Sequence, residues 1–511
     1  MVLNSKKWRH TLVTLLSSTH QIAVNYPIVT NGFKRHRFYS LSVRSRNTIM
    51  KTLYPLTTAL ALGISMPAFA DLNEDVEMLK EQVRALQTKQ GGNNLKFNVD
   101  YRVSLDSIKY KTAGGETYKN NDLLSNRLIL NMGYAYNENL VFRGALSYNK
   151  AYGEQPNQPG PYAGFDWVVN ENFDNDSNHV KVKEAYFLYL GDAFLGNEML
   201  PWTFSLGRRP STTGFLANNR EGFEEAKSPL AHSINVEFDG LSLNVKTEKV
   251  IGLTGSAIKL CAGRGMSNAR ARFDSTGYDY SKDKADLDNI DFIGFIITPY
   301  NDGQYNLQTQ IYYANHLIGM DAAAIMAAPM DPNSYALKEF GDLSNMTLSF
   351  EINGIGEFIN EFLDDTRVFA SYSMSKTHPK GDMAMLGSPD SETGSSYWVG
   401  VNVPGFIEGD SFGVEYNHGD KYWRSFTYGE DTLIGSKVAA RGDAIEAYYN
   451  LPVIDEALTA QIRYTKIDYD YTGSNGFFGS YTGAPLDMSN PMAANAVKEA
   501  EDLRLIVRYK F

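Results

Sequence analysis

Apolar and polar residues alternate with a period of two through most of the chain, beginning at residue 95. The first such segment runs from Leu95 to Leu105 and spans eleven residues. In a β-strand, successive side chains point to opposite faces, so this segment would have one apolar face and one polar face. A tilted strand needs about 9–11 residues to cross a bilayer. The pattern therefore predicts a strand that spans a membrane.

The final segment of the chain repeats this pattern with a strongly charged polar face. Apolar residues occupy every second position of the last nine, and Arg504, Arg508 and Lys510 lie between them. Three cations on one face are hard to fit into a soluble core. The alternation ends on Tyr509 and Phe511, and a terminal phenylalanine on such a strand resembles the signal that outer-membrane barrels present to their insertion machinery.

Sixteen segments with strand character follow one another along the chain. We place them near 95–110, 123–136, 140–149, 180–190, 202–209, 232–238, 241–263, 290–298, 305–314, 346–354, 366–375, 396–403, 411–418, 442–451, 457–470 and 501–511. Their connections alternate between shorter and longer ones, as in bacterial barrels with short periplasmic turns and long outer loops. An even number of strands puts both termini in the periplasm, and sixteen strands leave an aqueous channel.

The pattern thus predicts an all-β fold, a transmembrane antiparallel β-barrel over residues 95–511 with about 16 strands. Eighteen strands is the alternative, because the segment 241–263 is long enough to hide an extra hairpin. A tight turn is expected at Asp239 and Gly240, since an Asp-Gly pair between two alternating segments is a strong hairpin signal.

The region before the barrel carries a targeting signal. Met50 is followed by a lysine, a mostly apolar run and a small-residue cleavage sequence between Ala70 and Asp71. This order is typical of a secretory signal peptide. We expect residues 50–70 to be that peptide and residues 1–49 to be an upstream extension from a misplaced start codon. The alternative is a long cytoplasmic extension with an internal apolar segment.

Residues 71–90 follow a heptad pattern. Its seam consists of Leu72, Val76, Leu79, Val83 and Leu86. Valine at a and leucine at d are typical of a coiled coil, but two heptads are too short to be stable alone. We expect a short periplasmic coiled-coil helix that helps subunits associate, with a homotrimer as the assembly, or an amphipathic helix on the barrel rim. Residues 91–94 form the linker to the barrel.

Charge narrows the choice of partners. The 511 residues include 48 Lys and Arg and 59 Asp and Glu. The first 70 residues hold nine of the basic residues and none of the acidic ones, so their removal would give a net charge of −20. Binding of nucleic acid needs clustered cations and is therefore disfavoured. A barrel implies outer-membrane lipid, lipopolysaccharide and the insertion machinery as partners.

Few residues suggest chemistry. The single Cys261 excludes an intramolecular disulfide, an all-cysteine zinc site and covalently attached c-type haem. The common signatures of zinc peptidases and serine hydrolases are missing. We expect no metal, cofactor or catalytic residue, although a Ser, His and Asp from separated parts of the chain could still assemble.

Charged residues on the polar strand faces are candidates for the wall of a pore. They are Arg102, Arg127, Arg143, Arg209, Glu237, Glu415, Glu446, Arg463, Arg504 and Arg508. Rings of charge are one way in which pores select ions. We expect a transverse field that orients small hydrophilic solutes, or else a solvated wall without preference. The mixture of signs leaves selectivity open, with the acidic total pointing weakly to cations.

Two loops have notable charge patterns. The segment 210–231 carries Arg220, Glu221, Glu224, Glu225 and Lys227. It could fold inward and constrict the pore, or lie outside and bind divalent cations or lipopolysaccharide phosphate. A second loop has the spacing of the start of a calcium loop without its glycine and distal glutamate, which favours an ordinary polar loop. Its acidic and amide residues are Asp174, Asp176 and Asn178.

Several stretches resemble an uncharacterised family of bacterial outer-membrane proteins, the domain of unknown function 3373 family, whose members are often described as porins. The stretches are 207–211 (GRRPS), 238–240 (FDG), 415–423 (EYNHGDKYW) and 436–442 (SKVAARG). The resemblance covers the coil and most of residues 95–511 and implies an outer-membrane barrel. It carries no catalytic residue. The family's usual start lacks the first 49 residues, which supports the misplaced start codon.

These features predict a porin-like channel of a Gram-negative outer membrane for passive diffusion of small hydrophilic solutes or ions, and not an enzyme. One alternative is a barrel enzyme of the lipase or protease type. The other is a barrel conduit or adhesin that works with a partner, such as a multihaem cytochrome threaded through the pore.

Overall fold

The computed structural model describes residues 95–152, 179–222, 224–269, 280, 287–356 and 359–511. Several predicted features lie outside these residues and stay predictions. They are the upstream segment 1–49, the signal peptide 50–70, the coil 71–90, the linker 91–94 and the calcium-like spacing at 174–178.

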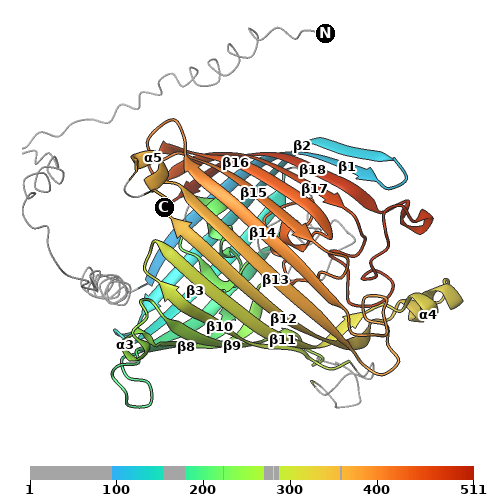
Figure 1. Cartoon of the computed structure of the whole chain (residues 1–511), viewed down its shortest axis with the longest axis horizontal. Coiled ribbons are helices and arrows are strands. Elements are labelled where there is room, and N and C mark those ends of the chain that lie inside the picture. The colour runs from blue at the N-terminus through green and yellow to red at the C-terminus, as the bar shows by residue number, and fades with distance from the viewer. Residues whose placement is uncertain (1–94, 153–178, 223, 270–279, 281–286, 357–358) are drawn as a thin grey trace, which may run out of the picture. The chain divides into compact units, whose positions relative to one another are not determined.

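Sixteen strands of the described chain form one closed antiparallel barrel (Figure 1). They are β1 (Leu95–Thr112), β2 (Thr117–Ala135), β3 (Leu140–Ala151), β4 (Val180–Gly191), β5 (Trp202–Arg209), β8 (Phe238–Lys246), β9 (Ala257–Met266), β10 (Ile290–Asn301), β11 (Tyr305–Gly319), β12 (Lys338–Asn353), β13 (Arg367–Pro379), β14 (Thr393–Pro404), β15 (Ser411–Gly419), β16 (Gly442–Ile454), β17 (Leu458–Tyr469) and β18 (Val497–Lys510). The barrel closes where β1 pairs with β18, with Arg102 opposite Arg508. The predicted fold and strand number are confirmed.

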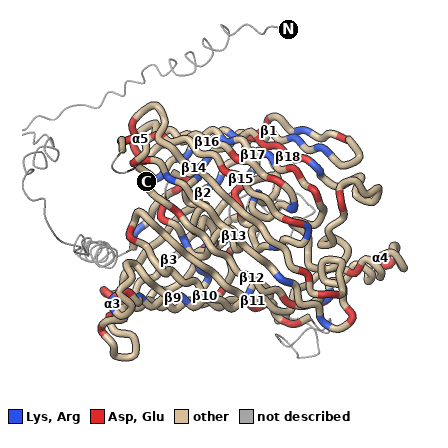
Figure 2. Tube along the Cα trace, in the orientation of Figure 1, with Lys and Arg blue, Asp and Glu red and all other residues tan. Residues whose placement is uncertain are grey.

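The alternation of the sequence becomes an apolar outside and a polar inside. On the outer face, Phe97 and Leu505 are 51% and 47% exposed, whereas Arg102 and Asp106 on the inner face are 5% and 0% exposed. Charged positions follow one another along β1, β17 and β18 (Figure 2). A soluble protein shows the opposite distribution, because leucine is normally buried and arginine exposed.

The other elements are short. They are the two-stranded parallel sheet of β6 (Gly214–Phe215) and β7 (Lys227–Leu230), the helices α3 (Glu248–Ile251), α4 (Ala322–Ala327) and α5 (Glu361–Asp364), and the 3-10 turns η2 (Ala217–Glu221), η3 (Pro332–Tyr335), η4 (Lys437–Ala439) and η5 (Pro491–Ala493). Within the described residues, no helix combines the length and the apolar composition needed to cross a membrane.

Two strand predictions were wrong, but the two errors together leave the predicted number of barrel strands unchanged. Residues 232–237 belong to no barrel strand, and the segment 241–263 contains parts of two strands, β8 and β9, separated by α3. The apolar residues Val250 and Ile251 made this turn resemble part of a continuous strand. Its short helix ends at Gly252, which lies in the left-handed region at φ 77°. An additional strand was therefore counted before the turn and one was missed after it.

The Asp239-Gly240 hairpin was also wrong, because both residues lie inside β8. Gly240 pairs with Gly207 of β5 on one side and with Gly263 of β9 on the other. A Cβ atom at Gly240 would lie 2.2 Å from the carbonyl oxygen of Ala262. The glycine here permits close packing of strands rather than a turn.

The two ends of the barrel differ. Both ends of the described chain, Leu95 and Phe511, lie at the same end as α3 and α5, which we call the terminal end; α4 lies at the opposite end, the loop end (Figure 1). Longer connections emerge at the loop end, as predicted. The exceptions are 113–116, where β1 and β2 continue as a hairpin beyond the predicted strand ends, and 380–392, which is no longer than 354–366 at the terminal end.

Candidate functional site: a lumen occupied by two loops

Two connections from the loop end fold into the barrel and are buried there. The first inner loop, residues 210–237, links β5 to β8, and the second inner loop, residues 420–441, links β15 to β16. Leu216 and His232 of the first loop and Trp423 and Arg424 of the second are at most 1% exposed. Of the two locations considered for the first loop, inside the pore and outside the barrel, the structure shows the first.

The two inner loops bind each other through their backbones. The amide of Asn235 donates to the carbonyl of Phe426 at 2.6 Å, and the amide of Phe426 donates to the carbonyl of Ser233 at 2.9 Å. The ring of Phe426 also packs edge-on against Phe292 of β10, with 4.8 Å between ring centroids. The loops therefore form one unit that is attached to the wall by an apolar cluster.

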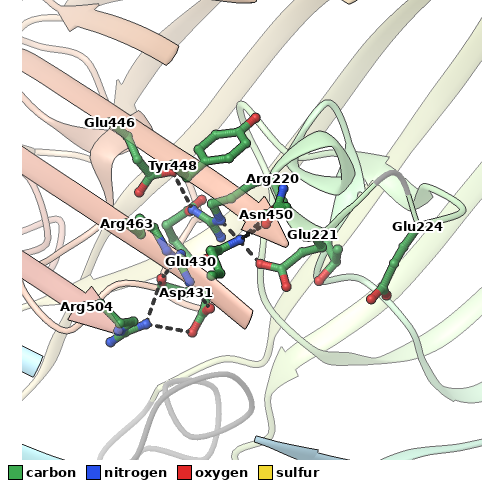
Figure 3. Close-up of polar contacts among 12 residues, drawn as sticks. Arg220, Glu221, Glu224, Glu430, Asp431, Glu446, Tyr448, Asn450, Arg463 and Arg504 are labelled. Carbon is green, nitrogen blue, oxygen red and sulfur yellow. Dashed lines mark hydrogen bonds and ion pairs between the residues drawn. The ribbon is translucent and has the colours of Figure 1, made fainter. Parts of the chain in front are cut away.

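The first inner loop reaches across the lumen to strands near the barrel seam. Its Arg220 donates to Glu446 of β16 at 3.1 Å and also pairs with Glu430 of the second loop. Glu221 and Glu224 lie 3.1 and 2.8 Å from the guanidinium of Arg508 on β18. Figure 3 shows this group, with Arg220 between its acidic partners. Opposite charges thus fix the loop to the far wall.

Asp431 of the second inner loop is the meeting point of three arginines. Its carboxylate lies 2.6 Å from Arg102, 3.1 Å from Arg463 and 3.3 Å from Arg504. Burial alone raises the pKa of Asp431, but the three guanidinium charges outweigh it and hold this pKa well below its usual range. The carboxylate is therefore ionised, and it neutralises part of a cationic wall.

A second buried ion-pair group involves Lys437 of the second loop. Its ammonium lies 2.7 Å from Glu415 of β15 and pairs with Glu446 as well. Nearby, Arg441 donates to the backbone carbonyls of Thr472 and Gly483, at 2.8 and 2.9 Å. These contacts connect the second loop to the wall and to the following connection, residues 470–496.

His232 is buried in the first inner loop between serines and tryptophans. Its two ring nitrogens lie 2.8 Å from the hydroxyl of Ser371 and 2.9 Å from that of Ser396. The rings of Trp398 and Trp423 have centroids 5.9 and 5.6 Å from that of His232. Burial lowers the pKa of His232 to about 3. The imidazole is thus neutral at physiological pH.

Small polar side chains on β12 to β14 make room for the loops. The inward residues that share this property, all at most 4% exposed, are Thr347, Ser349, Ser371, Ser373, Ser375, Thr377 and Ser396. In the sequence this appears as serine at every second position of 371–375. Such a run on an inward face indicates that another part of the chain packs against it.

The structure brings most of the candidate wall residues into ion pairs. The buried and paired ones are Arg102, Arg127, Glu237, Glu415, Glu446, Arg463 and Arg504, and Arg508 is paired and half-buried. Arg143 and Arg209 are different, because neither forms an ion pair with a residue that the structure describes. Sequence reasoning missed Glu430, Asp431, Lys437 and the central position of His232, since loop residues have no periodicity that shows which way they face.

The proposed insertion signal lies at the terminal end. Tyr509 and Phe511 are 43% and 76% exposed, and their rings are stacked with centroids 6.3 Å apart. The backbone amide of Phe511 donates to Val99 of β1 at 3.0 Å. Across the described residues, no three His, Cys, Asp or Glu side chains form a group that could hold a metal ion.

Comparison with known proteins gives one family match and a set of similar barrels. The profile of the family described as "Protein of unknown function (DUF3373)" matches residues 117–511, which include both inner loops. A comparison with curated proteins found no match.

Three solved structures illustrate the similarity. OmpF of Salmonella typhi, solved with daunomycin, is 12% identical with a TM-score of 0.41, over 82% of this chain and 98% of its own. OprB of Pseudomonas putida is 12% identical with a TM-score of 0.43, over 82% and 94%. An anion-selective porin from Comamonas acidovorans is 11% identical with a TM-score of 0.43, over 82% and 99%.

Proposed function

The chain belongs to the family described as protein of unknown function (DUF3373), and we propose that it is a porin-like channel of a Gram-negative outer membrane. Small hydrophilic solutes and ions would pass through it by diffusion. The observation that carries this proposal is the closed barrel of sixteen strands with an apolar outer face and a charged inner face. Closure pairs the backbone groups, as hydrocarbon requires, and this strand number leaves space for an aqueous lumen.

The two inner loops would act as the constriction of this channel. They pack against β12 to β18, where inward side chains are almost completely buried, and also contact Lys183 of β4, Phe292 of β10 and Gln310 of β11. On β2 and β3, the inward residues Asn131 and Arg143 keep solvent exposure, whereas Ile129, Ala145 and Ser147 on the same strands are at most 7% exposed. We place the path of solutes along that side, so that only small solutes pass.

We propose no enzymatic activity for the barrel. His232 between Ser371 and Ser396 has the residue types of a hydrolase site, which makes it the strongest enzyme candidate among the described residues. However, the three are 1%, 4% and 1% exposed. A nucleophile must reach its substrate, and these serines are covered by the loops. A fluorophosphonate probe should therefore leave the folded protein unlabelled, whereas stoichiometric labelling of Ser371 or Ser396 would support the enzyme alternative.

The conduit alternative is disfavoured by the same loops. A multihaem cytochrome threaded through the pore would have to displace both loops and break the buried pairs of Asp431 and Arg220. Further parts of the proposal are periplasmic termini, an insertion signal at Tyr509 and Phe511, contact with lipid and lipopolysaccharide, and a homotrimer aided by the coil at 71–90.

Conductance in planar bilayers tests the proposal. Purified protein, shown to be folded by its heat-modifiable migration in gels, should insert with stepwise increases in current. The same preparation should make liposomes permeable to small sugars but not to large ones. Folded protein that gives neither current nor swelling would refute the channel. Asp431→Asn, which should loosen the constriction, provides a variant whose altered step size would assign the current to this lumen.

A further inference from the structure

The wall of the lumen has two sides with different charge balance. Beside β1 and β15 to β18, the cations of the wall pair with acids of the wall and of the inner loops, as Arg102 does with Asp431. On the side formed by β3, β4, β5, β8 and β9, Lys183 pairs with Glu237. Three further cations of that side, on β3, β5 and β9, have no acidic partner among the described residues. They are Arg143, Arg209 and Lys259.

These three side chains face the lumen from the same side of the wall. Arg143 lies opposite Tyr186 in the β3–β4 register, and Tyr186 lies opposite Gly207, two positions before Arg209 on β5. Lys259 lies opposite Asn244 of β8, nearer the terminal end. The Nε atom of Arg209 is buried without a hydrogen-bond acceptor. Three like charges thus line this side of the lumen, and the Nε donor of Arg209 has no acceptor.

The side chains of this cationic group keep contact with solvent. Arg143 is exposed, and Arg209 and Lys259 are partly exposed, whereas other inward residues, such as Ser205 and Ser242 on the same side and Glu446 across the lumen, are at most 3% exposed. A solute on the proposed path therefore passes the unpaired cations and is separated from most buried carboxylates by the inner loops. The local charge next to the path, not the acidic total of the chain, decides which ions enter.

We propose that the channel is anion-selective and that Arg143, Arg209 and Lys259 form its anion-attracting wall. This inference rests on the proposed function and adds the sign of the solute charge. A unit charge about 6 Å from an ion in water changes the local concentration of that ion by about threefold. Three unpaired cations should therefore favour small anions, such as carboxylates or inorganic phosphate, over cations of equal size.

Reversal potentials in a tenfold KCl gradient test this proposal. The wild-type channel should be more permeable to chloride than to potassium. The triple variant Arg143→Gln, Arg209→Gln, Lys259→Gln should lower the chloride-to-potassium permeability ratio by at least about threefold. Arg264→Gln is the matched control, since Arg264 lies on β9 like Lys259 but is exposed and pairs with Asp291 at 2.7 Å. The control should leave the ratio unchanged.

A second measurement needs no bilayer, because the chain has a single cysteine close to the cationic group. Cys261 shares the inward face of β9 with Lys259, two positions away, and is partly exposed. The rate of its reaction with an anionic sulfonatoethyl methanethiosulfonate can be divided by the rate with a cationic trimethylammonioethyl reagent. This ratio should be about threefold higher for Cys261 than for free cysteine. Lys259→Gln should reduce this preference, and Cys261→Ser gives the unlabelled blank.

The outcomes separate this inference from the proposed function. Conductance that is cation-selective, or chloride preference that survives the triple variant, would refute the anion-attracting wall and leave the channel intact. Absence of conductance from folded protein would refute both. If the triple variant fails to fold, the single variant Arg143→Gln and the Cys261 reaction decide, and equal relative rates for both reagents would contradict the proposal.

Discussion

Asp431 accepts two hydrogen bonds from the guanidinium of Arg102, at 2.6 and 2.9 Å, although 329 positions separate the two residues in the sequence. The pair joins the second inner loop to the first strand of the barrel. Because both side chains are 5% exposed, the interaction is shielded from water, and its loss cannot be replaced by solvation.

Asp431→Asn should therefore release the second inner loop. The substitution leaves three buried guanidinium groups without their common carboxylate, and breaking a buried ion pair costs about 3–5 kcal/mol. We expect a lower free energy of unfolding in detergent with urea and a larger single-channel conductance. Asp382→Asn, in an exposed loop, is the control and should change neither. A variant with wild-type conductance would show that Asp431 does not hold the constriction.

His232 should make the stability of the barrel depend on pH. Its pKa is about 3 in the folded protein and 6.5 ordinarily, so the unfolded chain binds more protons between these values. Stability contributed by the neutral ring is complete above pH 6.5 and falls by about 1.4 kcal/mol per pH unit as the pH decreases toward 3. His232→Gln lacks this titration. Unfolding free energies measured from pH 7 to 4 should decline less steeply in the variant, and equal slopes would exclude the effect.

Gly240→Ala should disrupt the pairing of β8 with β9. The added Cβ would lie 2.2 Å from the carbonyl oxygen of Ala262, a backbone atom that can move only with its strand. We expect a smaller folded fraction in heat-modifiable migration. The control is Gly133→Ala, since the nearest atom to a Cβ at Gly133 is the end of Arg143 at 3.8 Å. Equal folding of the two variants would contradict the close strand contact.

The variant Leu505→Arg tests whether lipid or water surrounds the outer face of the barrel. Leu505 lies near the middle of β18 and is 47% exposed on the outer face. An arginine facing the middle of a bilayer destabilises a barrel by about 2–4 kcal/mol, whereas one at the interface costs about 0–1 kcal/mol. Leu95→Arg at the terminal end is therefore the control. Unfolding from lipid vesicles measures both, and an unaffected Leu505→Arg variant would argue against a lipid-facing surface.

The sequence predicted the barrel because strands carry their orientation in their periodicity. Alternation over eleven residues after Leu95 identified both faces of β1, and the inward prediction for Arg102 follows from it. The same reasoning failed at residues 232–238, where alternation of Ile234 and Val236 reflects burial inside the first inner loop, not strand pairing.

The candidate site was only half predictable for a related reason. The alternation of the strands predicts that Arg463 and Arg504 point inward. It does not predict that one carboxylate from residues 420–441 pairs with both. Ion pairs between distant segments depend on how loops fold, and Asp431 stands in a stretch without periodicity. Unpaired Arg143 could not be distinguished from paired Arg127 for the same reason.

The contacts of Asp431 also bear on how the molecule is assembled. Arg102 belongs to the first strand and Arg504 to the last, so the two sides of this carboxylate's binding pocket exist together only once the sheet has become a ring. The second inner loop thus bridges the junction between β1 and β18, and it can form these ion pairs only after the final strand has been inserted. Newly made chains would therefore pass through a barrel that lacks the Asp431 ion pairs before the inner loops fill its lumen.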